Sequence, residues 1–78
     1  MNINEARKVL PAVWVIYCRP KDHPEHFVVR KWYGEVCEKR VALLGNLEAA
    51  RFFVRDEGAC VNLGRSSTDD PVIAEVWI

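Results

Sequence analysis

The sequence predicts a small α+β domain of the order β-β-α-β-β, with a four-stranded antiparallel sheet and one helix packed on one face. Two patterns predict this class. Four runs rich in β-branched and aromatic residues are separated by turn-forming residues. A further segment carries apolar residues at helical spacing behind a capping residue. With 78 residues, of which 50% are hydrophobic and 28% charged, we expect one globular domain over residues 1–78.

The first pair of strands is predicted at residues 13–17 (VWVIY) and 27–33 (FVVRKWY). Pro20 and Pro24 interrupt the stretch between them, so the two strands should form a hairpin with a long connection. Residues 1–11 show no clear period and are expected to be flexible or to form a short helical turn. Pro11 would end such a turn, because the residue before a proline avoids helical angles.

The helix is predicted to begin at Asn46. Its side chain can accept a backbone N–H, and Glu48 then lies in the first turn, where the helix dipole favours an anion. Gly58 can close the helix or the turn that follows it. The predicted apolar stripe consists of Leu47, Ala50, Phe53 and Val54.

The last two strands are predicted at residues 60–63 and 72–78, with a polar turn at residues 66–71 between them. Residues 34–45 stay open at this point: they can form a loop, an extension of the second strand or a helix.

Side chains alternate along each strand, and one helix cannot cover both faces of four strands. In the last strand Val72, Ala74, Val76 and Ile78 are expected under the helix, so that the alternate residues point away from it. The open face would then carry tryptophans beside charges, which is typical of a contact surface. The candidate interaction surface is Trp14, Arg30, Trp32, Glu75 and Trp77.

The alternative interpretation is structural: the tryptophans pack in the core or at an edge, and Arg30 and Glu75 form an ordinary cross-strand pair.

Charge and cysteine content restrict the partners. Eleven basic and eleven acidic residues cancel, so no strong field favours nucleic acid or a membrane. There is no apolar run of about 18–20 residues and no signal peptide, and the three cysteines are an odd number. We therefore expect a cytoplasmic protein with reduced thiols, no membrane partner, and either a second copy or another protein as its partner.

No residue pattern predicts a metal or a cofactor. The nearest approach to a zinc site is Cys18, His23, His26 and Cys37, whose cysteines stand singly rather than as a close pair. The alternative interpretation is that both histidines are exposed loop residues and both cysteines act as small hydrophobic residues.

Catalysis is not predicted either. Cys18 beside Arg19 and near His23 has the residue types of a thiol nucleophile, but no spacing sets their geometry. Asp69 and Asp70 before a proline are ordinary turn residues. We expect a non-enzymatic protein.

Single-stranded nucleic-acid binding is the alternative function, because small sheets can stack bases on aromatic side chains and follow the backbone with cations. The basic residues of the first hairpin are Arg19, Lys21, Arg30 and Lys31, and the nearby aromatic residues are Trp14, Trp32 and Tyr33. Against this function stand four acidic residues in the same region: Asp22, Glu25, Glu35 and Glu38.

Three stretches carry a resemblance to a family. They are residues 14–33 (WVIYCRPKDHPEHFVVRKWY), residues 46–51 (NLEAAR) and a C-terminus of the DDPVI-EVW type at residues 69–77. Together they resemble short uncharacterised bacterial proteins, some of them phage- or prophage-associated. The resemblance implies a small stand-alone accessory or regulatory protein, and it supplies no catalytic residue, ligand or cofactor. Cys18 stands where an acidic residue is commoner in that family, which argues further against zinc.

Overall fold

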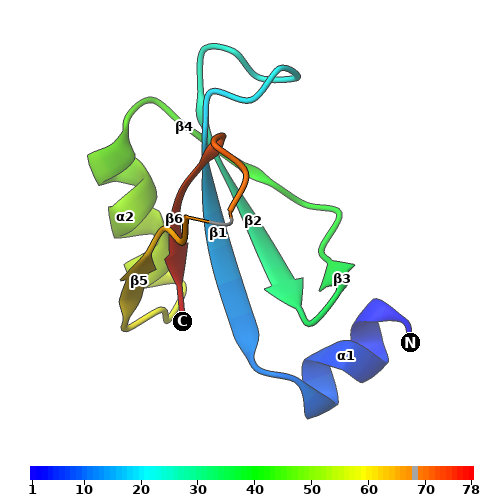
Figure 1. Ribbon diagram of the computed structural model, residues 1–78. Coiled ribbons are helices and arrows are strands. Elements are labelled where there is room, and N and C mark those ends of the chain that lie inside the picture. Colours follow the sequence, from blue (N-terminus) through cyan, green and yellow to red (C-terminus); the bar gives the residue numbers. More distant parts are fainter. Residues whose placement is uncertain (68) are drawn as a thin grey trace.

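The computed structural model describes residues 1–67 and 69–78, which form two helices and an open six-stranded antiparallel sheet (Figure 1). The elements are α1 (Ile3–Val9), β1 (Ala12–Cys18), β2 (Phe27–Tyr33), β3 (Val36–Cys37), β4 (Ala42–Leu44), α2 (Leu47–Asp56), β5 (Asn62–Gly64) and β6 (Ile73–Trp77). The α+β class is confirmed. The four-stranded β-β-α-β-β unit is wrong, because two short strands and an additional helix complete the fold.

The sheet has the order β3-β2-β1-β6-β5, and β4 pairs with β2 as well. The central strand is β1, whose Trp14 lies opposite Lys31 on β2 and opposite Trp77 on β6. The predicted hairpin of β1 and β2 is confirmed, with Ala12 opposite Tyr33 at one end and Cys18 opposite Phe27 at the other.

The undecided segment, residues 34–45, supplies β3 and β4. Gly34 has φ +63°, and this left-handed conformation lets the chain reverse within two residues and pair Val36 with Tyr33. The chain then returns along β2, where Ala42 pairs with Val29. Strands of two and three residues are too short to show the alternation by which strands are recognised in sequence.

Helix α1 occupies the N-terminal segment that had no clear period. The Asn2 side chain accepts from the Glu5 backbone N–H at 3.0 Å, and the helix ends just before Pro11, as the restriction on the preceding residue requires. Ala6 is fully buried where α1 packs on β2 and β3.

The predicted start of α2 is confirmed: Asn46 Oδ1 accepts from the Ala49 N–H at 2.8 Å. Ala50 and Val54 are fully buried, and Leu47 and Phe53 pack beside them, so the predicted apolar stripe faces the sheet. The buried cluster under α2 consists of Trp14, Ile16, Val29, Ala50, Val54, Ala59 and Trp77.

The face prediction for the last strand is wrong. Trp77 (5% exposed) and Glu75 (7% exposed) lie under α2, whereas Val76 pairs with Val15 on the opposite face. The orientation is reversed because Trp77 contributes a large apolar surface to the core and α2 supplies an arginine for Glu75. A bulge in β6 opposite Ile16 and Tyr17 brings Ala74 toward the core as well.

The described part of the predicted polar turn contains a hydrogen bond from Asp69 N–H to the Ser66 carbonyl, at 3.0 Å. Thr68, in the same turn, lies outside the described residues. Among the described residues, neither helix has the length and apolar character needed to cross a membrane.

Candidate functional site

The sheet face opposite α2 is the candidate site. The strand registers place Val13 opposite Trp32, Val15 opposite Arg30, and Val15 also opposite Val76, so these side chains share that face. We call this surface, with Tyr17, the open face.

A groove of about 370 Å³ lies at one end of the open face. Its wall includes Tyr17, Arg30, Trp32 and Val72. The Trp32 ring is half-buried, and its Nε1 is buried on the side of the Tyr17 hydroxyl. The Trp32 groove therefore combines aromatic surface with a guanidinium group, two features enriched in the anchor points of protein interfaces.

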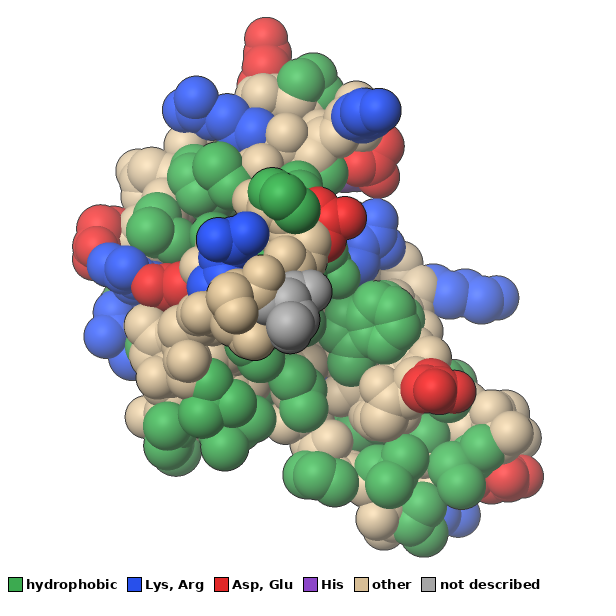
Figure 2. All heavy atoms as spheres, in the orientation of Figure 1, with side chains coloured by type: hydrophobic (Ala, Val, Ile, Leu, Met, Phe, Trp, Pro, Cys, Tyr) green, Lys and Arg blue, Asp and Glu red, His purple; other side chains and the backbone are tan. Residues whose placement is uncertain are grey.

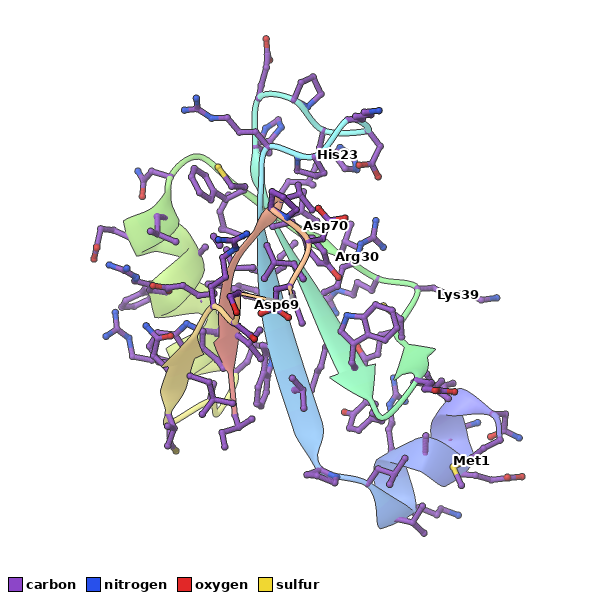
Figure 3. All side chains as sticks on the ribbon, in the orientation of Figure 1. Met1, His23, Arg30, Lys39, Asp69 and Asp70 are labelled. Carbon is purple, nitrogen blue, oxygen red and sulfur yellow. The ribbon has the colours of Figure 1, made fainter. Side chains whose placement is uncertain are left out.

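The charges at the groove are partly matched. Arg30 Nη2 lies 3.4 Å from Asp22 Oδ2, and the same carboxylate oxygen lies 3.8 Å from His23 Nε2. Figure 3 labels Arg30, His23 and Asp70, which come from three different segments and lie toward one end of the sheet. Arg30 is a partly exposed cation beside apolar surface rather than a buried ion pair.

Burial raises the pKa of the Tyr17 hydroxyl, while the Trp32 indole N–H and Arg30 act in the opposite direction. Because the net pKa shift is upward, Tyr17 is neutral at physiological pH and presents a hydroxyl donor and an aromatic ring to the groove.

Exposed apolar side chains extend the open face toward β5. Val61 and Ile78 exchange backbone hydrogen bonds of 2.8 and 2.9 Å, and their side chains are 48% and 46% exposed. Leu63, at a bulge in β5, is 57% exposed. Figure 2 shows hydrophobic side chains gathered over β5 and the end of β6. These three residues form the β5 apolar strip.

The five predicted surface residues fall into two groups. Arg30 and Trp32 lie together on the open face, whereas Trp14, Glu75 and Trp77 lie buried under α2. The expectation that all five share one open face is therefore wrong. Tyr17 lies on the same face of β1 as Val13 and Val15, so strand alternation assigns it to the open face once that face is known. The sequence pattern gave no signal for the β5 apolar strip.

Glu75 is buried because donors surround its carboxylate. Arg51 Nε lies 2.9 Å from Oε1, Arg51 Nη2 bonds Oε2, and Trp77 Nε1 donates to Oε1 at 3.1 Å. The Arg51 hydrogen bonds lower the pKa of Glu75 despite its burial. This network joins α2 to the sheet and has a structural role.

The cysteines and histidines do not gather into a metal-binding cluster in the part of the chain that the structure describes. No three His, Cys, Asp or Glu side chains there come close enough to hold a metal ion. Cys18 is exposed, and burial raises the pKa of the half-buried Cys37, which opposes formation of a thiolate.

Comparison with family models, with curated proteins and with solved structures finds no match to this chain. The likeness to short bacterial proteins therefore stays an expectation from sequence.

Proposed function

We propose that this protein is a small non-enzymatic interaction module that binds a protein partner through the open face. The observation that carries the proposal is the Trp32 groove, an aromatic cavity on the side of the sheet that α2 leaves uncovered. The β5 apolar strip would extend the contact area. The resemblance to phage-associated proteins favours an accessory or regulatory role.

The chemistry of the groove favours an apolar anchor side chain on the partner. Tyr17 and Trp32 offer ring surface. Arg30 can hydrogen-bond a carboxylate or a backbone carbonyl at the rim. An aromatic or aliphatic residue beside an acidic residue is the pattern expected in a binding segment.

Nucleic acid is the less supported partner. Arg30 and Lys31 alternate onto opposite faces of β2, so the hairpin cations do not form one track. Lys31 Nζ lies over the Trp14 ring on the α2 side, 5.0 Å from its centre, while Arg30 faces Asp22. Of these two cations, a strand following the open face would meet only Arg30, which lies beside a carboxylate.

The test is selection of binding peptides from a random displayed library, followed by titration against variants. Peptides enriched in an aromatic or aliphatic anchor should bind the wild-type protein, and Trp32→Ser should weaken them about tenfold or more. Phe52→Ser is the matched control, because Phe52 is a 70% exposed aromatic residue on α2. Circular dichroism verifies that each variant is folded.

Selected peptides that bind Trp32→Ser as well as the wild type would contradict the proposal. Binding of an oligothymidylate that falls steeply with salt and is lost in Arg30→Ala would favour the nucleic-acid alternative instead. Light scattering on the wild type shows whether a second copy occupies the face, in which case Trp32→Ser should return the mass to that of the monomer.

A further inference from the structure

A second cavity lies on the other side of the sheet, between β2, the last turns of α2 and the segment that leads into β4. Its volume is about 150 Å³. Trp14, Val29 and Phe53 supply apolar wall, and Lys31 and Arg40 supply cationic groups. This cavity is separate from the Trp32 groove, because Lys31 and Arg30 point to opposite faces of β2.

The cations of this cavity are not paired with its carboxylates. Glu38 also lines it, but its carboxylate pairs with Arg7 Nη2 at 2.9 Å. No described carboxylate forms an ion pair with Lys31 or with Arg40. The wall carries two cations, Lys31 and Arg40, and two carboxylates, Glu38 and Glu57, but its cations are not used in ion pairs with the described carboxylates.

Lys31 is held in place by aromatic rings rather than by an anion. Its Nζ lies 5.0 Å from the centre of the Trp14 ring and 5.6 Å from that of Tyr33. Such contacts orient an ammonium group without satisfying its N–H donors, so Lys31 stays able to bind a carboxylate.

Trp14 is the most buried aromatic part of the cavity wall. The residue is only 6% exposed, and its Nε1 has no hydrogen-bond acceptor among the described residues.

We propose that this cavity binds a small organic acid, with its carboxylate between Lys31 and Arg40 and its apolar part against Trp14, Val29 and Phe53. A cavity of about 150 Å³ accommodates a ligand of roughly the size of a benzene ring. Cations above an apolar floor match the two ends of such a molecule. The inference goes beyond the proposed function, because its residues and its ligand class both differ from those of the open face.

The experiment is titration of the full chain with sodium benzoate, followed by the indole N–H resonances in ¹H–¹⁵N NMR spectra at constant ionic strength. Benzoate should shift the Trp14 resonance saturably, with a dissociation constant on the order of 1 mM for so small a ligand. The uncharged benzamide and the cationic benzylamine should bind more weakly.

Two variants test the anion contact. Lys31→Met keeps the aliphatic stem over Trp14 and removes the charge, and Arg40→Gln removes the second cation. Each should weaken benzoate about tenfold, as loss of a charge-assisted hydrogen bond does. Lys39→Gln is the matched control, because Lys39 is exposed, next in sequence to Arg40 and not part of the cavity wall.

Three results would overturn the inference: no saturable shift of the Trp14 resonance, binding of benzylamine as tight as that of benzoate, or equal affinity in the wild type, Lys31→Met and Arg40→Gln. The peptide titrations at the open face are unaffected by any of these results, so the two proposals can fail independently.

Discussion

Glu75 illustrates, at the scale of a single residue, how a charged side chain can belong to the interior of a small protein. An ionised carboxylate is costly to bury unless donors surround it. Arg51 and Trp77 provide those donors from α2 and from β6 itself. The position looks like a solvent-facing one in sequence because its partner lies 24 residues away.

Replacement of Glu75 by Gln should lower the free energy of unfolding by about 2 kcal/mol at pH 7, because charge-assisted hydrogen bonds are lost. The pKa of Glu75 is lowered in the folded protein, so its contribution is present above the pKa of the unfolded chain. That contribution disappears as the pH falls through the lower, folded-state pKa. Urea titrations at pH 7 and pH 3 should therefore show a smaller difference between variant and wild type at pH 3.

Glu48→Gln is the control for this prediction. Glu48 also bonds Arg51, at 2.7 Å, but its side chain is 77% exposed, and exposed pairs contribute little. An equal loss of stability in Glu48→Gln and Glu75→Gln would contradict the structural role of the buried pair.

At the scale of elements, the formation of a short strand depends more on the backbone conformation of one turn residue than on the strand propensity of its own residues. The β2–β3 turn requires positive φ at Gly34, and a Cβ added there would lie 3.0 Å from Leu10 Cδ1, just after α1. One glycine therefore serves both the turn and the packing of the N-terminal segment.

Gly34→Ala should lower the free energy of unfolding by about 1–2 kcal/mol, the usual cost of a left-handed conformation in a residue with a Cβ. Gly45→Ala should be close to neutral, because its φ lies outside the left-handed range and its Cβ would meet nothing within 4 Å. Thermal unfolding of the two variants measures the difference, and equal melting temperatures would show that the turn tolerates a side chain.

At the scale of the whole molecule, the two faces of the sheet differ in what packs against them. One face and α2 enclose the core, and the other carries the Trp32 groove and the β5 apolar strip. The second face carries no helix; Val15 and Val28 are buried on it, and the Trp32 groove and the β5 apolar strip supply its accessible apolar surface.

This division predicts unequal effects of the same substitution on the two faces. Trp77→Ala should cost about 3–5 kcal/mol of stability, as loss of a buried aromatic residue does. Trp32→Ala should cost less than half as much, because Trp32 is half-buried at the groove. Urea unfolding followed by far-UV circular dichroism gives both values, and a larger loss in Trp32→Ala would mean that the open face belongs to the core.

Much of the fold could be predicted from local patterns. The β-branched and aromatic runs at residues 13–17, 27–33 and 72–78 coincide with β1, β2 and β6. Asn46 marks the start of α2. The strands β3 and β4 could not be predicted, because each is too short for alternation and is held in place by pairing with β2.

The sequence alone therefore determined the α+β class, the long strands, and the existence of two unlike faces. Which face is inside was decided only by the tertiary structure. Alternation along a strand is symmetrical and assigns residues to two sets without ranking them. Long-range contacts decide which set is buried. Arg51 on α2 pairs with Glu75, and Trp77 packs beside Trp14, so the core forms on the side of β6 that carries its charged residue.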